Sequence, residues 1–144
     1  MTDVTMKRKV MVLGNELSRC MPRSKAFVAA WKVIKAGGLT LAVKGTSYGS
    51  RQEALRRLNK YNPAQIKTVL VPEPENPVDS GAIAVMVFIQ GGKGMFTLGY
   101  ISAKETAVVR ALPHQFLNLN IVSGTWYSRG REFVTYGARV TIRQ

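Results

Sequence analysis

Apolar residues in the first 37 positions recur at three- and four-residue steps, which is the spacing of one helical face. Two such stripes are present: Val10, Leu13, Leu17 and Cys20, followed by Phe27, Trp31 and Ile34. Pro22 separates the stripes, and the pair Gly37–Gly38 ends the second one. The pattern predicts a helical hairpin over residues 1–37, with Cys20 buried on its stripe and with Phe27 and Trp31 in the core between the helices.

From residue 38 onward the pattern changes to short apolar or alternating runs, which are typical of strands. We expect strands over residues 39–45, 66–71, 82–89, 95–101, 117–122 and 132–143, with a loop at 123–130. Ser50-x-x-Glu53 and Ser102-x-x-Glu105 have the spacing of capping boxes and predict two short helices, the second ending at Pro113. The expected fold is therefore α+β, with about six strands in a small OB-like β-barrel and two short helices. The domains are 1–37, the basic hairpin extension, and 38–144.

The net charge of the chain indicates what kind of partner the protein binds. Among 144 residues, 21 Lys and Arg stand against 8 Asp and Glu, which gives a formal net charge of +13. Residues 1–37 carry eight basic and two acidic residues, so the excess is spread over both pieces. A polyanion is the expected partner, and nucleic acid is the commonest one. The alternative is that the positive charge only keeps the protein soluble.

The composition and the motifs argue against a disulfide-bonded, zinc-binding, membrane-spanning or catalytic protein. With one cysteine, Cys20, and one histidine, His114, we expect neither a disulfide nor a zinc site, and no cofactor. The longest apolar run, 82–89, is far shorter than a membrane span, and no signal peptide is evident. We therefore expect a cytoplasmic protein. No Gly-rich Lys-Ser/Thr phosphate loop or catalytic constellation is present, so we expect it to be non-catalytic.

The stretch EPENPVDSGAIAV, residues 73–85, places prolines and acidic residues directly before the most apolar strand. Pro74 and Pro77 fix φ and exclude a helix or an interior strand. Asp79 and Ser80 before Gly81 are turn formers. The sequence therefore predicts a stiff acidic turn at the rim of a sheet.

Together with flanking motifs, this turn resembles the HIRAN domain over residues 38–144. The resemblance rests on Gly45-x-x-Tyr48, on 73–79 followed by Ala82-Ile-Ala-Val85, and on Gly99-Tyr-Ile101 before a helix. It implies a modified oligonucleotide-binding barrel that recognises DNA ends, above all the 3′ end of single-stranded DNA, in repair, replication or mobile elements. HIRAN domains are also found fused to helicase-like or nuclease domains. This chain departs from the family pattern at Glu75, where Asn is common, and at Val78, where a second aromatic is common.

The resemblance implies roles for three residues of an end pocket. Asp79 would accept the terminal 3′-hydroxyl and repel a phosphate, Asn76 would supply an amide contact, and Tyr48 would stack on a base. The alternatives are that Asn76 and Asp79 only close the turn through Asx hydrogen bonds, and that Tyr48 is a packed residue near a strand end.

Basic residues of the second half are candidates for holding the nucleic-acid backbone. The set is Lys104, Arg129, Arg131, Arg139 and Arg143. Trp126 and Tyr127 precede Arg129 in the expected loop 123–130, where rings could stack on bases or fold back on the barrel. The alternative for Arg139 and Arg143 is a solvated strand face. Four further basic residues are expected on a solvated helix face: Arg51, Arg56, Arg57 and Lys60.

A different class of function is also open. The apolar stripes of the helical hairpin could dock residues 5–36 on a protein partner, such as a helicase or nuclease, which would make the chain an adaptor. The sequence does not separate DNA from RNA as the bound polymer.

Overall fold

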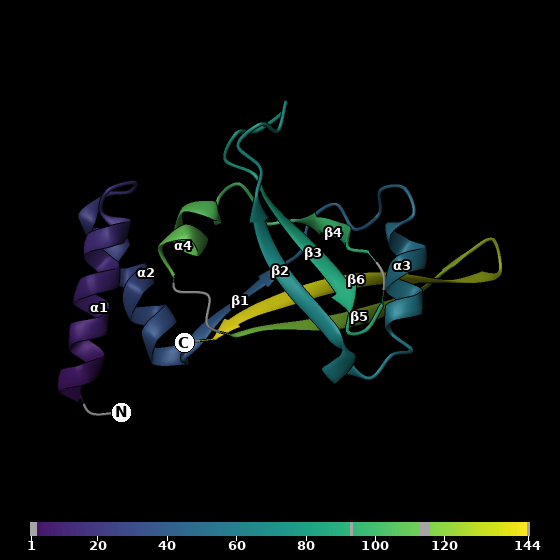
Figure 1. Ribbon diagram of the computed structural model, residues 1–144, viewed down its shortest axis with the longest axis horizontal. Coiled ribbons are helices and arrows are strands. Elements are labelled where there is room, and N and C mark those ends of the chain that lie inside the picture. Colours follow the sequence, from purple (N-terminus) through teal and green to yellow (C-terminus); the bar gives the residue numbers. More distant parts are fainter. Residues whose placement is uncertain (1–2, 93, 113–115, 144) are drawn as a thin grey trace.

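The computed structural model describes residues 3–92, 94–112 and 116–143, and it has an α+β fold (Figure 1). The helices are α1 Asp3–Leu17, α2 Arg23–Ala36, α3 Arg51–Leu58 and α4 Thr106–Ala111, with a 3-10 turn at Pro63–Gln65. The strands are β1 Gly38–Ala42, β2 Ile66–Pro72, β3 Ile83–Ile89, β4 Phe96–Tyr100, β5 Phe116–Ser128 and β6 Arg131–Arg143. The prediction of six strands, two short helices and a preceding helical hairpin is confirmed at this level.

The six strands form two separate antiparallel sheets of three strands, in the orders β1-β6-β5 and β2-β3-β4. In Figure 1 the strands of the second sheet cross over those of the first. Their facing side chains are fully buried, with Val85, Val87 and Leu98 from one sheet and Val140 and Ile142 from the other. The sheets do not close into a barrel, so that part of the prediction is wrong.

Among the described residues, one isolated β-bridge joins the two sheets, just after the end of β1. Lys44 and Tyr100 exchange two backbone hydrogen bonds of 2.8 Å, so the chain that leaves β1 pairs with β4. Gly99 makes this approach possible, because a Cβ at that position would collide with the carbonyl oxygen of Lys44 and the side chain of Val43. The crossing places the segment after β1 beside the end of β4.

The helical hairpin is confirmed, but its second helix turns a different face to the core. The buried residues of α2 are small or branched: Ala26, Ala30, Val33 and Ile34. Trp31 is 42% exposed and Phe27 is only partly buried, against Gly14 of α1. Small residues let two helices approach closely, and the large rings then lie at the edge of the contact. Cys20, expected to be buried, is a free and exposed cysteine just beyond α1.

The two predicted capping boxes do not form. Ser50 precedes α3 without a side-chain capping bond, and Glu53 instead bonds Arg56 and Arg57 at 2.7 Å and 3.2 Å. α4 begins one residue after Glu105, also without a side-chain cap. These helices are held by burial of residues such as Leu55, Leu58 and Val109. The expected helix stop Pro113 and the single histidine His114 lie outside the described residues.

The largest difference from prediction is the hairpin of β5 and β6. The expected loop 123–130 is mostly strand, because the ladder runs without interruption from Leu117–Ile142 to Ser128–Arg131. Only Arg129 and Gly130 form the turn, with φ of 51° and 75°, the left-handed conformation that tight hairpin turns require. The distal part of this hairpin projects beyond the body of the molecule (Figure 1). We call residues 122–136 the arm.

The buried residues of the helical hairpin and of both sheets belong to one hydrophobic cluster. Residues 1–37 therefore share a core with residues 38–144. None of the helices in the described ranges combines the length and apolar character needed to cross a membrane.

Candidate nucleic-acid interface

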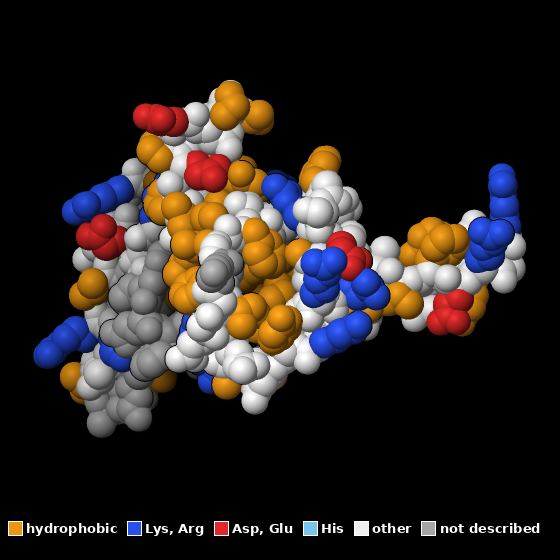
Figure 2. All heavy atoms as spheres, turned by 45° about the vertical axis from the view of Figure 1, so that its right-hand side comes forward, with side chains coloured by type: hydrophobic (Ala, Val, Ile, Leu, Met, Phe, Trp, Pro, Cys, Tyr) orange, Lys and Arg blue, Asp and Glu red, His pale blue; other side chains and the backbone are white. Residues whose placement is uncertain are grey.

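The three residues of the predicted end pocket lie around one cavity of about 760 Å³. Its lining residues come from the segment after β1, the turn between β2 and β3, and the end of β4. They are Lys44, Gly45, Tyr48, Arg51, Asn76, Val78, Asp79, Ala82, Tyr100, Ile101, Ser102 and Ala103. Figure 2 shows acidic side chains on the loop that joins β2 and β3, above a surface rich in hydrophobic side chains. Segments far apart in the sequence thus build one site.

The acidic turn is held by hydrogen bonds that fix its shape. Asn76 Nδ2 donates to Glu73 Oε1 at 3.0 Å, and Asn76 Oδ1 accepts from the backbone N–H groups of Val78 and Asp79 at 3.0 Å and 3.1 Å. Tyr100 Oη donates to the same Glu73 oxygen at 2.9 Å, which ties the turn to β4. The amide of Asn76 is therefore engaged within the turn, as the alternative interpretation expected.

Asp79 combines a turn-closing bond with an exposed carboxylate. Its Oδ1 accepts the backbone N–H of Gly81 at 2.8 Å, while the residue as a whole is exposed and lines the cavity. Arg110 of α4 donates to the carbonyl of Gly81 at 2.6 Å and fixes the same corner from the other side. The carboxylate is thus held in place without being buried.

Tyr48 stands on a short loop whose backbone is fixed by the first turn of α3. Arg51 Nη1 donates to the carbonyl of Gly45 at 2.7 Å, and Gln52 Nε2 donates to the carbonyl of Thr46 at 3.0 Å. Gly45 has a φ of +79°, which favours glycine. The Tyr48 ring is 71% exposed at the edge of the cavity, so the alternative of a packed tyrosine is wrong.

Sequence reasoning missed two cations of this site. Arg51, expected on a solvated helix face, lines the cavity and lies over the Tyr100 ring at 5.7 Å from its centroid. Lys44 lines the cavity because its backbone pairs with Tyr100. The position of Arg51 just after the Gly45–Tyr48 motif was the available signal, whereas the placement of Lys44 depends on the crossing of two sheets.

The hydrogen bond to Glu73 also changes the acid–base behaviour of Tyr100. Donation to the Glu73 carboxylate, together with burial and the negative charge itself, raises the pKa of Tyr100, and nearby Arg51 opposes the effect. The phenol is therefore a stable donor at neutral pH.

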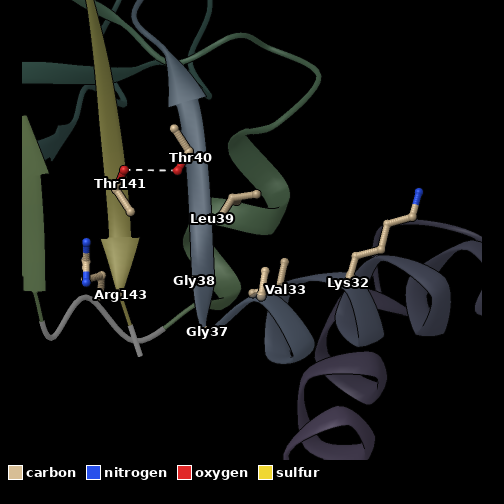
Figure 3. A pocket seen from close by; sticks show the side chains of 9 residues that line it. Lys32, Val33, Gly37, Gly38, Leu39, Thr40, Thr141 and Arg143 are labelled. Atoms are coloured by element: carbon tan, nitrogen blue, oxygen red, sulfur yellow. Dashed lines mark hydrogen bonds between the residues drawn. The ribbon is translucent and has the colours of Figure 1, made fainter. Parts of the chain in front are cut away.

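The remaining predicted basic residues lie elsewhere. Lys104 is exposed in the segment after the lining residues Ser102 and Ala103. Arg139 is exposed on β6, and Arg143 lines a different cavity of about 560 Å³ with Lys32, Thr40 and Thr141 (Figure 3). This second cavity lies at the start of β1, about 20 Å along that extended segment from Gly45.

Arg129 and Arg131 are at the tip of the arm. They lie beyond Tyr136, whose backbone N–H and carbonyl are both bonded by Gln52 of α3 at 2.9 Å and 2.7 Å. Arg131 lies five positions before Tyr136 on β6, a length of about 17 Å. The structure therefore brings Tyr48, Asn76 and Asp79 together and places the predicted arginines on other surfaces.

In the described part of the chain, no group of three or more His, Cys, Asp or Glu side chains is arranged to hold a metal ion. Comparison with protein-family models, curated proteins and solved structures finds no match to this chain. A function for this chain is therefore inferred from its own residues.

Proposed function

We propose that the protein binds single-stranded DNA and holds a free 3′ end in the Tyr48–Asp79 cavity, without catalysing a reaction on its own. The proposal includes a HIRAN-like function, a relation of the two sheets to oligonucleotide-binding folds, and a cytoplasmic location. The observation that carries it is the meeting of an exposed ring, a fixed carboxylate and two cations around one cavity of a protein with a net charge of +13.

Each of these groups has a part in holding a strand end. Lys44 and Arg51 attract phosphate oxygens, and the exposed Tyr48 ring offers a stacking surface for a base. The Asp79 carboxylate accepts a hydrogen bond from a terminal hydroxyl and repels a terminal phosphate. An acidic corner in a basic protein then selects the kind of end that is bound.

The departures from the family pattern modify the cavity without removing these groups. Val78 is exposed and lines the cavity where a second ring is common in the family, so less stacking surface is expected. Glu75 is exposed on the same turn and adds a negative charge that weakens binding of any DNA. Asp79 and Tyr48 keep the positions that the proposal needs.

The test compares oligonucleotides that differ only in their 3′ group. Fluorescence anisotropy should show that a 3′-hydroxyl strand binds the wild type about tenfold more tightly than the same strand with a 3′-phosphate, because one charge-assisted hydrogen bond is lost and a repulsion is added. Asp79→Asn should bring the ratio close to one, mainly by tightening the 3′-phosphate complex.

Glu75→Gln is the matched control, because it removes the same charge from the same turn. It should tighten both complexes equally and leave the ratio unchanged. Equal affinity of the wild type for the two strands would contradict the role of Asp79.

A second candidate function is the adaptor, and exposed apolar residues on both helices of the hairpin favour it. They are Val4, Met11, Val12, Val28 and Trp31. A salt series separates the two functions. A protein that contacts phosphates loses affinity for single strands with a log–log slope of about −0.7 per contact, whereas an adaptor that does not hold DNA shows no such binding.

A further inference from the structure

The outer face of the β5–β6 ribbon has an unusual composition. Side chains alternate between the two faces of a strand, so one face carries the even positions of β5 and the odd positions of β6. From the tip toward the body these are Arg131, Ser128, Trp126, Phe133, Gly124, Thr135, Val122, Gly137, Asn120, Arg139, Asn118, Thr141 and Arg143. Three are arginines and none is acidic. The one acidic residue of the two strands, Glu132, lies on the opposite face.

An exposed aromatic pair lies near the outer end of this face. Trp126 and Phe133 are directly opposite in the ladder, and their rings stack with centroids 4.6 Å apart and planes 18° from parallel. They are 46% and 39% exposed, although both are among the largest apolar side chains of the arm. A pair of this kind offers ring surface to a planar partner.

Cations stand on both sides of the aromatic pair along the ribbon. Arg131 lies two residues from Phe133 toward the tip, and Arg139 lies six residues from Phe133 toward the body. The span from Arg131 to Arg139 is about 26 Å of strand. Figure 2 shows Lys or Arg side chains at the tip of the arm, with hydrophobic side chains behind them.

The space beside the rings is open. A Cβ built on Gly124, the next outer position after Trp126 on β5, meets nothing within 4 Å. Arg129, which forms the turn, is the one non-glycine residue with positive φ among the described residues, and it adds a cation at the tip.

We propose that this outer face of the arm binds the internal part of a single nucleic-acid strand, with a base stacked on Trp126 and phosphates held by Arg131 and Arg139. The inference takes from the proposed function only that the bound polymer is a nucleic acid. It needs neither the Tyr48–Asp79 cavity nor a strand end. The charge of this face favours a nucleic acid over a protein as the partner, because the face is cationic and carries no carboxylate. Its rings also suit stacking on planar bases.

The direct test uses Trp126 as its own reporter in the full chain. The sequence has two tryptophans, so Trp31→Phe leaves Trp126 as the only one. The probes are an oligothymidylate with a free 3′-hydroxyl and a covalently closed circle of the same base, which has no end. Both should quench Trp126 fluorescence on binding, because a stacked base quenches indole emission. Absence of quenching with both probes would overturn the proposal.

Variants at the ring separate stacking from a purely structural role. Measured by anisotropy with the labelled circle, Trp126→Leu should weaken binding about tenfold, near the lower end of the loss expected for one stacked base. Trp126→Phe keeps a ring and should stay within about threefold of the wild type. If Trp126→Leu and Trp126→Phe bind the circle with the same affinity as each other, the ring acts only as a strand-to-strand contact and the proposal fails.

Tyr127→Leu is the matched control, because Tyr127 is an exposed ring of the same ribbon on the opposite face. It should leave affinity for the circle unchanged. Equal weakening by Tyr127→Leu and Trp126→Leu would show a non-specific effect and contradict a binding face. Self-association that is lost in Trp126→Leu while binding of the circle is unaffected would instead identify a contact between copies, and would also contradict the proposal.

The outcomes keep the two sites apart. If the wild type binds 3′-hydroxyl and 3′-phosphate strands equally but the circle still quenches Trp126, the end pocket fails and the arm stands. If the circle does not bind while the preference for the 3′-hydroxyl persists, the arm fails and the pocket stands.

Discussion

The acidic turn at residues 73–82 and the arm at residues 122–136 both extend from the ends of paired strands, but they are held in different ways. The turn is bonded from outside itself, by Tyr100 of β4 to Glu73 and by Arg110 of α4 to Gly81. Beyond the Gln52 bonds at Tyr136, the arm is held by its own ladder and by the stack of Trp126 on Phe133.

The way each region is held determines what it is suited to recognise. A turn fixed at several points holds a carboxylate in one place, which is what discrimination between a hydroxyl and a phosphate requires. A ribbon that carries repeated cations and rings along its length suits the repeating chemistry of a strand, where many registers of binding are equivalent. Substitutions in or beneath the turn should therefore cost more stability than substitutions in the arm.

The largest effect is expected at Gly99, beneath the cavity. Gly99→Ala should lower the free energy of unfolding by about 3 kcal/mol, because the new Cβ would collide with the carbonyl of Lys44 and force β1 and β4 apart. The same displacement moves Lys44, which is proposed to attract phosphate oxygens, so affinity for single-stranded DNA should fall as well. Urea unfolding followed by circular dichroism measures the first effect.

The matched substitution on the arm is Gly124→Ala. Its Cβ enters open space, so the free energy of unfolding should change by less than about 0.5 kcal/mol. Similar losses of stability for the two alanine variants would show that the arm is as tightly packed as the region under the cavity. That result would contradict the difference between the turn and the arm.

The sequence predicted the elements well where a pattern of burial produces them. The alternation of apolar residues located β1, β2, β3 and β4 to within a few residues, and proline and glycine located the turns between them. Residues 123–128 of β5 were missed because the outer part of the arm is exposed on both faces, so pairing between strands forms it and no alternation of burial marks it.

The sequence predicted the site residues that belong to continuous motifs and missed those that only the tertiary fold brings to the cavity. Tyr48, Asn76 and Asp79 belong to motifs that are continuous in sequence, and they meet at one cavity. Lys44 and Arg51 reach it only because β1 crosses to β4 and α3 begins beside Gly45. The buried face of α2 was predicted wrongly for a similar reason. The size of a side chain does not reveal which stripe of a helix a neighbouring helix will cover, and Trp31, expected in the core, is 42% exposed.

A smaller effect is expected when the amide of Asn76 is changed to a carboxylate. Asn76→Asp keeps the acceptor for the backbone N–H groups of the turn, but it loses the donor to Glu73 and places two negative charges together. The free energy of unfolding at pH 7 should fall by about 1–2 kcal/mol. The loss should shrink as the pH falls toward about 4, since protonation of one carboxyl removes the repulsion.

Asn120→Asp provides the same chemical change on the other sheet. Asn120 is exposed and lies opposite Arg139 in the ladder, so a carboxylate there gains an attractive neighbour and no stability should be lost at pH 7. Thermal unfolding of the two variants at pH 7 and pH 4 makes the comparison. A pH-independent loss in Asn76→Asp would contradict the repulsion as its cause.

The smallest effect is expected for Tyr100→Phe, and its pH dependence lies in the alkaline range. Loss of the phenol donor to Glu73 should cost about 1 kcal/mol at pH 7, while the ring under Arg51 is kept. Because the hydrogen bond raises the pKa of Tyr100 above its value in the unfolded chain, about 10, the stabilisation is complete below that pH. It disappears as the pH rises through the folded-state pKa.

The stability difference between the wild type and Tyr100→Phe should therefore be constant up to about pH 10 and then decrease. Every other titratable group is common to both proteins, so its contribution cancels in the difference. Tyr127→Phe, which removes an exposed hydroxyl of the arm, is the control and should leave the free energy of unfolding at pH 7 unchanged. If the difference for Tyr100→Phe grows above pH 10, the bond to Glu73 does not hold the turn to β4, and the turn is as independent of the body as the arm is.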